Sequence, residues 1–353
     1  MIITGLQLQN YRSYNSASFE FEDGVNIIVG PNTSGKTNLL EAILLIATGK
    51  SYRSSDEQLI NNNSDWGRLE ATTKKNNTRI IRLQNNHQTK PLKTFEIDDK
   101  KYTRLPKNQH ISIVLFEPNQ LQFLTTQPEH RRNLFDDLLE QTDSSFTSLK
   151  RDYLKTLKQR NSLLKKPPSI INTQIFAWNI RLSELAGQIV SKRQSLIETV
   201  NHDISSIYSD LAGNNNSIKL SYLSKINHSN YANNMNKQLE ERLDTDIERG
   251  FTGVGPHRDD IKITIDSADI IDNASRGEVR TLLLAFKVKS SILLEEVNKH
   301  KPLLLFDDVF GELDGSRRKA LTNYLKGHQT FITTTDADVV GKKFTQTAQQ
   351  ILL

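Results

Sequence analysis

The pattern of apolar positions predicts a chain that begins and ends in strands. Alternating or largely apolar runs predict strands at residues 2–8, 17–21, 25–29, 111–116, 261–265, 302–306 and 331–335. Residues 67–102 alternate in short runs that are broken by asparagine pairs. Such alternation is typical of antiparallel hairpins with one face in water. Residues 50–54 lie between these regions and are predicted to be an exposed polar link.

Apolar residues recur at helical spacing in the middle of the chain. Helices are predicted at residues 38–47, 129–141, 144–164, 173–211, 237–248 and 280–297. Pro167-Pro168 separates two of them, and the asparagine-rich residues 227–236 are predicted to be a loop. Strands that bracket helices at both ends predict an α/β fold. We expect one lobe built from residues 1–127 and 250–353, with an antiparallel β subregion and a helical insertion at 128–249.

The first candidate for chemistry is a glycine-rich turn between a predicted strand and a predicted helix. Residues 30–37 read G-P-N-T-S-G-K-T and fit the pattern G-x-x-x-x-G-K-[ST]. Backbone N–H groups and the helix N-terminus would hold phosphate oxygens, Lys36 would reach the β- and γ-phosphates, and Thr37 would ligate Mg²⁺. The predicted nucleotide contacts are Gly30, Pro31, Asn32, Thr33, Ser34, Gly35, Lys36 and Thr37. A chance glycine turn is the alternative, and the flanking strand and helix disfavour it.

Two carboxylates follow the apolar strand near the C-terminal end of the sequence. Asp307 and Asp308 come directly after Leu303-Leu304-Leu305-Phe306. Functional groups gather at the carboxyl ends of parallel strands, where the phosphate loop also opens. Asp307 is therefore predicted to hold Mg²⁺ together with Thr37, and Asp308 to orient or deprotonate the attacking water. The alternative is that the pair caps the next helix.

A second anion-binding surface is predicted at the start of the long helix near residue 280. Ser275-Arg276-Gly277 combines a serine, a glycine and a helix N-terminus. The alternative is a plain helix cap, in which Ser275 and Glu278 form a capping box. Both can hold, since a capped N-terminus can also receive a phosphate.

Composition and charge narrow the class of protein. The chain has 353 residues, 46 Lys and Arg against 41 Asp and Glu, a net charge of +5 and no cysteine. Disulfides, thiolate nucleophiles and cysteine metal sites are excluded, and no histidine lies in a ligand-spaced cluster. No signal peptide or apolar run of membrane-spanning length is visible, so a soluble cytoplasmic protein is expected.

The mild positive charge permits contact with a polyanion without requiring it. No base-reading module is present, so DNA binding should be sequence-independent and salt-sensitive. The candidate phosphate contacts are Lys74, Lys75, Arg79, Arg82, Lys90, Lys93, Lys100 and Lys101 in the hairpins, and Arg131, Arg132, Lys150, Arg151, Lys155, Lys158, Lys165 and Lys166 in the helical block. For each residue, a solvated surface charge is the alternative.

Taken in order, these segments resemble the ATP-binding-cassette ATPases of chromosome maintenance and repair, and among them the RecF family. The resemblance covers nearly the whole chain. It rests on N-Y-R at 10–12, the loop and helix at 30–42, T-G-K-S at 48–51, F-E-P at 116–118 with Arg131, Arg132 and Asp136, G-P-H-R-D-D at 255–260, S-R-G at 275–277, F-D-D-V-F-G-E-L-D at 306–314 and I-T-T-T at 332–335.

The resemblance implies a weak, DNA-stimulated ATPase that dimerises when ATP is bound. Arg12 would join the nucleotide contacts, Ser275 and Gly277 would contact the γ-phosphate held by the partner's loop, and Asp314 would lie along the interface. The catalytic set is then Lys36, Asp307, Asp308, Ser275, Gly277 and Asp314. Proteins of this family bind duplex DNA next to single-stranded gaps and work with RecR and RecO to load recombinase.

The sequence departs from the family pattern at a few positions, and alternatives stay open. Glu278 stands where Gln is commoner, Gly311 where Ser is commoner, and Ser13 where Asn is commoner. Asp308 is shorter than the Glu of many cassette ATPases, which predicts slow turnover. A structural DNA-bridging ATPase of the SMC type is the main alternative, although the insertion lacks the sustained heptads of a long coiled coil. A transporter subunit would have a fuller signature, and a nuclease would have a further metal-carboxylate domain.

Overall fold

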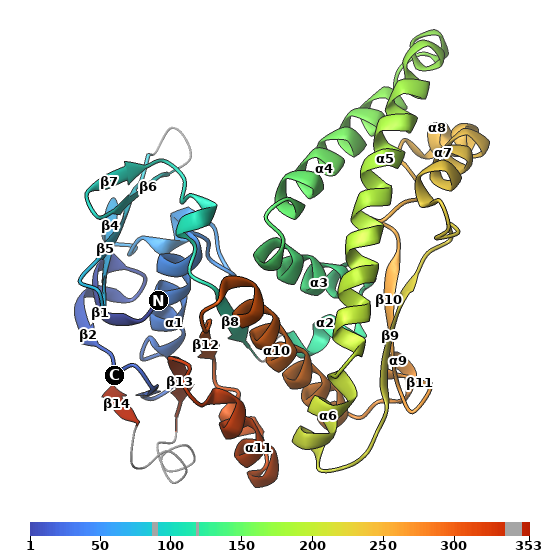
Figure 1. The fold of residues 1–353 in the computed structure, drawn as a ribbon. Coiled ribbons are helices and arrows are strands. Elements are labelled where there is room, and N and C mark those ends of the chain that lie inside the picture. Colours follow the sequence, from blue (N-terminus) through green and yellow to red (C-terminus); the bar gives the residue numbers. More distant parts are fainter. Residues whose placement is uncertain (87–90, 118–119, 336–347) are drawn as a thin grey trace. The chain divides into compact units, whose positions relative to one another are not determined.

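A computed structural model of the chain describes residues 1–86, 91–117, 120–335 and 348–353 (Figure 1). The chain forms two compact units. The first unit contains Met1–Gln120, Leu211–Gly213 and Ser290–Leu353, and the second contains Leu121–Asp210 and Asn214–Lys289. These boundaries differ from those of the predicted ATPase domain and insertion, and the division at 128 and 249 stays a prediction.

A five-stranded parallel sheet forms one layer of the first unit, with strand order β14-β3-β13-β12-β8. Its strands are β3 (Val25–Val29), β8 (Ile113–Phe116), β12 (Leu303–Phe306), β13 (Thr330–Thr334) and β14 (Gln349–Leu352). The four predicted strands in this sheet are confirmed, and their apolar runs are buried almost throughout. The edge strand β14 was not predicted, because its short Q-Q-I-L run is only half buried.

A six-stranded antiparallel sheet forms the other layer, with strand order β2-β1-β4-β5-β6-β7. Its strands are β1 (Ile3–Tyr11), β2 (Tyr14–Glu20), β4 (Trp66–Thr73), β5 (Thr78–Gln84), β6 (Leu92–Ile97) and β7 (Lys100–Tyr102). The predicted antiparallel hairpins are thus confirmed. Both ends of the chain belong to this unit, β1 in the antiparallel sheet and β14 in the parallel one (Figure 1).

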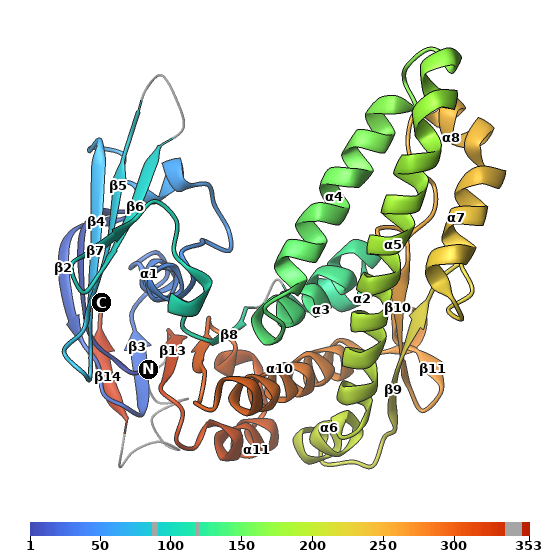
Figure 2. The same cartoon turned by 45° about the horizontal axis from the view of Figure 1, so that its top comes forward.

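Helix α1 (Lys36–Thr48) lies beside the two sheets of the first unit (Figure 2). Gly35 and Gly49 cap it in the left-handed conformation, with φ of 105° and 74°. Its leucine, isoleucine and alanine side chains are buried with residues of both sheets in one core. The unit is completed by α11 (Gly315–Leu325) and short 3-10 helices at Asp56–Leu59, Lys107–Gln109 and Phe310–Glu312.

The second unit is mainly helical. It contains α2 (Leu121–Thr125), α3 (Pro128–Thr142), α4 (Phe146–Leu163), α5 (Pro168–Asn201), α7 (Tyr231–Glu241), α8 (Leu243–Arg249), α9 (Ile270–Asn273) and most of α6 (Ile204–Ala212) and α10 (Arg276–Asn298). Helices α4 and α5 lie side by side (Figures 1 and 2). A three-stranded antiparallel sheet, β11 (Ala268–Asp269), β10 (Asp260–Ile265) and β9 (Ile218–Leu223), accompanies them. The predicted α/β fold class is confirmed.

Three predictions for the second unit were wrong in detail. The predicted helix at 173–211 is broken after Asn201, because the Asn201 side chain bonds the backbone of Leu220 in β9 at 2.8 Å in both directions. The predicted loop at 227–236 contains the start of α7, whose Tyr231, Met235 and Leu239 form a buried stripe at helical spacing. The predicted helix at 237–248 is divided between α7 and α8.

Within the described part of the chain, no helix combines the length and the apolar character needed to cross a membrane.

Candidate functional site

The glycine-rich turn connects the end of β3 to the start of α1, as the motif requires. Thr33 and Gly35 adopt left-handed backbone conformations, with φ of 73° and 105°. A Cβ atom on Gly35 would lie 2.7 Å from the Tyr14 hydroxyl, which itself donates to the Gly35 carbonyl at 3.1 Å. A Cβ on Gly30 would lie 2.5 Å from Ser34 Oγ. Glycine is therefore required at both ends of the turn.

The turn contains a buried hydroxyl group that forms no hydrogen bond with the described residues of the protein. The Ser34 hydroxyl oxygen is out of contact with solvent and has no hydrogen-bond partner among the described residues. Lys36 is buried, and its Nζ donates to the carbonyl oxygens of Gly30 at 2.7 Å and Pro31 at 2.8 Å. A buried donor without an acceptor needs an explanation. An anionic oxygen beside the ammonium group of Lys36 provides one, so the residues fit a phosphate group.

Asp307 is the point at which β12 and the phosphate loop meet. The hydroxyls of Thr37 and Thr333 donate to Asp307 Oδ1 at 3.0 Å and 2.9 Å. The Tyr52 hydroxyl donates to Asp307 Oδ2 at 3.3 Å. Burial, with a smaller effect of the Asp307 charge, raises the pKa of Tyr52 well above its ordinary value. The structure thus brings together Thr37 and Asp307, as the sequence indicated.

The oxygens of Thr37 and Asp307 suit a magnesium ion that takes most of its ligands from water and phosphate. They do not suit a metal held by protein side chains alone. Among the described residues, no group of three or more His, Cys, Asp or Glu side chains is arranged to hold a metal. Mg²⁺ usually takes one or two carboxylates and completes its shell with waters and substrate phosphates. One carboxylate and one hydroxyl next to a phosphate loop match that donor set.

Asp308 and Asp314 lie further along the same segment. Asp308 is exposed, with φ of 54°, and its backbone N–H donates to Thr333 Oγ1 at 2.8 Å. Asp314 caps α11, accepting from the Arg317 backbone N–H at 2.9 Å and from Ser316 Oγ at 2.6 Å. These hydrogen bonds lower the pKa of Asp314 to about 2. Both carboxylates belong to the first unit, and their catalytic and interface roles stay predictions.

Arg12 is held by a buried carboxylate that the sequence did not single out. It donates to Oε2 and Oε1 of Glu41, both at 2.8 Å, and Glu41 has no exposed surface. The hydroxyls of Ser51 and Ser54 donate to the same carboxylate at 2.5 Å and 3.0 Å. Burial acts to raise the pKa of Glu41, but hydrogen bonds from Arg12, Ser51 and Arg53 lower it to about 2. Glu41 is the only acidic residue of α1, and its position among apolar residues is the sequence signal that could have predicted a buried, paired carboxylate. The assignment of Arg12 to the nucleotide stays a prediction.

Residues 50–54 do not form the predicted exposed polar link. Ser51, Tyr52 and Ser54 are half-buried, and Ser51 and Ser54 bond Glu41 in α1 while Tyr52 bonds Asp307 after β12. Hydroxyl-rich composition suggested exposure, but here the hydroxyls satisfy two carboxylates.

Ser275 and Gly277 belong to the second unit, at the exposed start of α10. Ser275 donates to Glu278 Oε2 from its backbone N–H at 2.8 Å and from its hydroxyl at 2.7 Å. The Glu278 backbone N–H returns a bond to Ser275 Oγ at 3.3 Å. The capping box is therefore confirmed, and it gives Glu278 a local role. The contact of Ser275 and Gly277 with a γ-phosphate stays a prediction.

The G-P-H-R-D-D segment takes part in a buried polar network of the second unit. Arg193 forms two hydrogen bonds with Asp136, at 2.8 Å and 3.0 Å, and a third with the Pro256 carbonyl at 2.7 Å. Tyr222 and Tyr231 each donate to Asp259 Oδ2 at 2.9 Å. These charges and hydroxyls pair with one another, which is the pattern of a structural network.

Several of the cations predicted to contact DNA are buried or form ion pairs and hydrogen bonds within the protein. Arg79 and Arg131 are buried, and Arg131 pairs with Asp260 at 2.7 Å. Arg132 donates to the Asp259 carbonyl at 2.6 Å. The remaining paired candidates are Lys74 with Asp23, Arg82 with Glu96, Lys93 with Asp56, and Lys150 with Asp136 and Glu140. Lys90, and Pro118 of the F-E-P segment, lie outside the described residues.

Helix α4 and the turn after it present a row of exposed cations. Arg151, Lys155 and Lys158 follow one another at intervals of four and three residues, so they share one face of α4, and Lys165 lies in the turn after the helix. All four are exposed, and Arg151 lies 3.4 Å from Asp152. We call these four residues the α4 cationic row.

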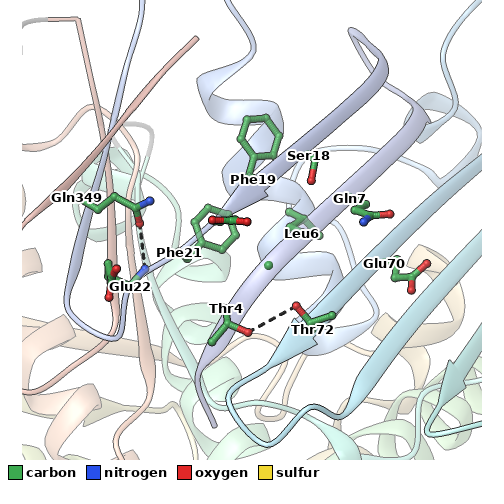
Figure 3. Close-up of a pocket in the computed structure, with 12 residues that line it drawn as sticks. Thr4, Leu6, Gln7, Ser18, Phe19, Phe21, Glu22, Glu70, Thr72 and Gln349 are labelled. Carbon is green, nitrogen blue, oxygen red and sulfur yellow. Dashed lines mark hydrogen bonds between the residues drawn. The ribbon is translucent and has the colours of Figure 1, made fainter.

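A separate pocket of about 400 Å³ lies beside β1 and β2 in the first unit (Figure 3). Its polar lining includes Thr4 and Thr72, whose hydroxyls are 3.5 Å apart, and Gln349, which accepts from the Glu22 backbone N–H at 3.0 Å. None of the predicted site residues lines it. The chemistry of the loop and Asp307, which lie elsewhere in this unit, points to them as the functional site.

Comparisons with known proteins show which family the chain resembles. The family model described as RecF/RecN/SMC N terminal domain matches residues 2–350. A protein named DNA replication and repair protein RecF from Lachnospira eligens is 33% identical over 342 residues, which cover 95% of this chain and 93% of that protein. A protein of the same name from Agathobacter rectalis is 34% identical over 344 residues, covering 96% and 93%.

Solved structures extend the similarity to the fold. A structure described as the recombination mediator protein RecF-ATP in the RecFOR pathway has a TM-score of 0.83 and 28% identity, covering 95% of this chain and 92% of that chain. A RecF-ATPrS structure of the same pathway has a TM-score of 0.82 and 28% identity, covering 96% and 93%. An Smc head bound to the C-winged helix domain of ScpA, at 17% identity and a TM-score of 0.54, is similar in fold alone.

Proposed function

Because the chain belongs to the RecF/RecN/SMC N terminal domain family, and within it to the RecF proteins, we propose that it is an ATPase of DNA replication and repair that dimerises on ATP. One observation carries this proposal. Thr37 of the phosphate loop and Asp307 after β12 meet at 3.0 Å, beside a buried serine hydroxyl without a partner. These are the groups that a magnesium–nucleotide site needs.

Each residue of the loop has a distinct task in this proposal. Residues 30–35 and the N-terminus of α1 hold phosphate oxygens through backbone N–H groups, and Ser34 donates its hydroxyl. Lys36 exchanges the carbonyls of Gly30 and Pro31 for phosphate oxygens. Thr37 and Asp307 hold Mg²⁺, which when bound offsets the phosphate charge that builds up during transfer. Arg12 contributes to the nucleotide contacts from its fixed position on Glu41.

Asp308 orients the attacking water and accepts its proton. Its exposed position after β12 leaves it accessible to solvent water. Because an aspartate reaches less far than a glutamate, turnover is slow. A slow hydrolytic step suits a protein whose ATP-bound form has to persist on DNA.

The second half of the ATP site comes from another copy of the chain. Ser275 and Gly277 at the start of α10 contact the γ-phosphate held by the partner's loop, and Asp314 lies along the interface. A nucleotide that bridges two surfaces favours the closed dimer through its γ-phosphate, and hydrolysis removes that preference. ATP thus acts as a timer for the dimer.

The partners are DNA and a mediator protein. DNA binding is sequence-independent, directed to duplex next to single-stranded gaps, and carried by phosphate contacts of cations such as the α4 cationic row. A RecR-type mediator then connects the bound dimer to recombinase loading. The names of the RecF relatives and of the RecFOR-pathway structures support this assignment.

The experiment that tests the proposal measures oligomeric state by light scattering with and without ATP and gapped DNA. Wild type is expected to be dimeric with ATP, and Lys36→Arg to stay in its ATP-free state because its planar cation does not reproduce the lysine contacts. Lys319→Arg in α11, outside the loop, is the matched control and should behave as wild type. Absence of an ATP-dependent dimer under every condition would reduce the protein to a nucleotide-binding module.

A further inference from the structure

The segment Ser51–Ser54 joins two carboxylates that lie far apart in the sequence. Ser51 and Ser54 donate to Glu41 in α1, and Tyr52 donates to Asp307 after β12. Between them, Arg53 donates to Asn38 at 2.5 Å and to Glu41 at 3.3 Å. We call residues 51–54 the strap. It is tied to the helix that follows the phosphate loop and, through Tyr52, to the predicted magnesium ligand.

The two oxygens of Asp307 have different partners. Oδ1 accepts from Thr37 and Thr333, whereas Oδ2 accepts from the Tyr52 hydroxyl at 3.3 Å. A carboxylate at the end of a strand can turn about its side-chain torsions. Donors on both oxygens, from β13 and from the strap, fix the plane in which its lone pairs point. Hydrogen bonds of this kind orient metal ligands and tune metal affinity.

We propose that Tyr52 is a positioning residue of the magnesium site, holding Asp307 in the orientation that binds the ion. The inference rests on the proposed function, since it concerns the metal of that site. Tyr52 acts through Asp307 and contacts neither the phosphates nor the attacking water.

The ring and the hydroxyl of Tyr52 have separable roles. The ring packs against the core formed by α1 and the two sheets, and the guanidinium of Arg53 lies 5.8 Å from its centroid. The hydroxyl supplies the bond to Asp307. Tyr52→Phe therefore removes the bond and keeps the packing. Tyr102→Phe is the matched control, because Tyr102 is a half-buried tyrosine that packs against the same core without a bond to Asp307.

The test measures Mn²⁺ binding, as a spectroscopic substitute for Mg²⁺, in the presence of saturating ATP by electron paramagnetic resonance. ATP binding in excess EDTA and the thermal midpoint are measured on the same samples. Tyr52→Phe is expected to weaken Mn²⁺ binding about tenfold, the lower end of the effect of losing such a partner. Metal-free ATP binding and the thermal midpoint should match wild type, and Tyr102→Phe should match wild type in every measurement.

Two results would overturn the inference. Unchanged Mn²⁺ affinity in Tyr52→Phe would show that the hydroxyl does not position the ligand. An equal loss of metal-free ATP binding would show a direct nucleotide contact or a general disturbance instead. Failure of the wild-type protein to bind Mn²⁺ with ATP would reject the proposed function itself, so the two failures are distinguishable.

Discussion

The phosphate loop of the first unit and the Arg193–Asp136 network of the second both contain buried polar groups, but they differ in what these groups bond. Arg193 uses its donors on Asp136, Tyr222 and the Pro256 carbonyl. In the loop, Ser34 Oγ has no partner among the described residues, and Lys36 Nζ donates to the backbone carbonyls of Gly30 and Pro31. Polar groups that complete one another stabilise the fold, whereas an unpartnered hydroxyl within a phosphate-loop motif fits a bound phosphate. Substitutions in the two regions should therefore separate stability from binding.

The largest expected effect is on stability, from Asp136→Ala. Removing one partner of a buried ion pair leaves an uncompensated charge, which costs about 3–5 kcal/mol. Urea denaturation should show this loss in the second unit. The matched control is Asp152→Ala, which breaks the exposed pair with Arg151 and should cost under about 1 kcal/mol. A similar loss in both variants would remove the distinction between the network and ordinary surface pairs.

Asp308→Asn should lower ATP turnover by roughly 100-fold or more, the usual contribution of a general base. Nucleotide affinity and unfolding free energy should stay near wild type, because Asp308 is exposed. Steady-state turnover with gapped DNA, together with equilibrium ATP binding, measures both. Unchanged turnover would remove Asp308 from the catalytic role.

Glu41 shares a property with each region. It lies in the helix after the loop, and both of its carboxylate oxygens accept hydrogen bonds, as those of Asp136 do. Its pKa is about 2 in the folded protein against 4.5 ordinarily, so its contribution is complete above about pH 4.5 and is lost as the pH falls toward 2. We expect it to supply roughly 2–3 kcal/mol of the acid dependence. Chemical denaturation at several pH values should show a flatter acid limb in Glu41→Gln. An identical limb in both proteins would mean that Glu41 titrates normally.

Lys36→Ala should weaken ATP binding about 10- to 100-fold, which corresponds to losing a charged hydrogen bond of about 1.5–3 kcal/mol. The unfolding free energy should fall by at most about 1–3 kcal/mol, since the change removes the hydrogen bonds to the buried Gly30 carbonyl and to the carbonyl of the exposed Pro31. Calorimetric titration and urea denaturation measure the two quantities. A large stability loss with unchanged ATP affinity would place Lys36 with the structural residues.

The smallest expected effect concerns the α4 cationic row. Lys155→Gln with Lys158→Gln should lower affinity for gapped DNA several-fold and reduce the salt slope by about two. A titration from roughly 50 to 200 mM salt measures the slope. Lys219→Gln with Lys225→Gln, at two exposed lysines outside the candidate DNA contacts, is the matched control. Equal losses in both double variants would mean that net charge, and not this row, determines binding.

Local sequence patterns predicted much of the fold and the loop. Largely apolar runs indicated four of the five parallel strands, and the G-x-x-x-x-G-K-T spacing indicated the turn before α1. Contacts between distant segments were not predictable in the same way. The break after Asn201 depends on the Leu220 backbone, and the burial of the strap depends on Glu41 and Asp307. Asn-rich residues before Met235 suggested a loop, although the buried stripe of α7 already had helical spacing.

The most direct test of the central claim, that one copy's loop and another copy's α10 complete the same ATP site, is a mixing experiment. Lys36→Ala disables the loop, and Ser275→Arg obstructs the start of α10, so each variant alone should lack turnover. A mixed dimer contains one site with an intact loop and an intact α10. ATP turnover should therefore reappear when the two variants are mixed with gapped DNA. No recovery, with both variants folded and Ser275→Arg still binding ATP, would contradict the shared site.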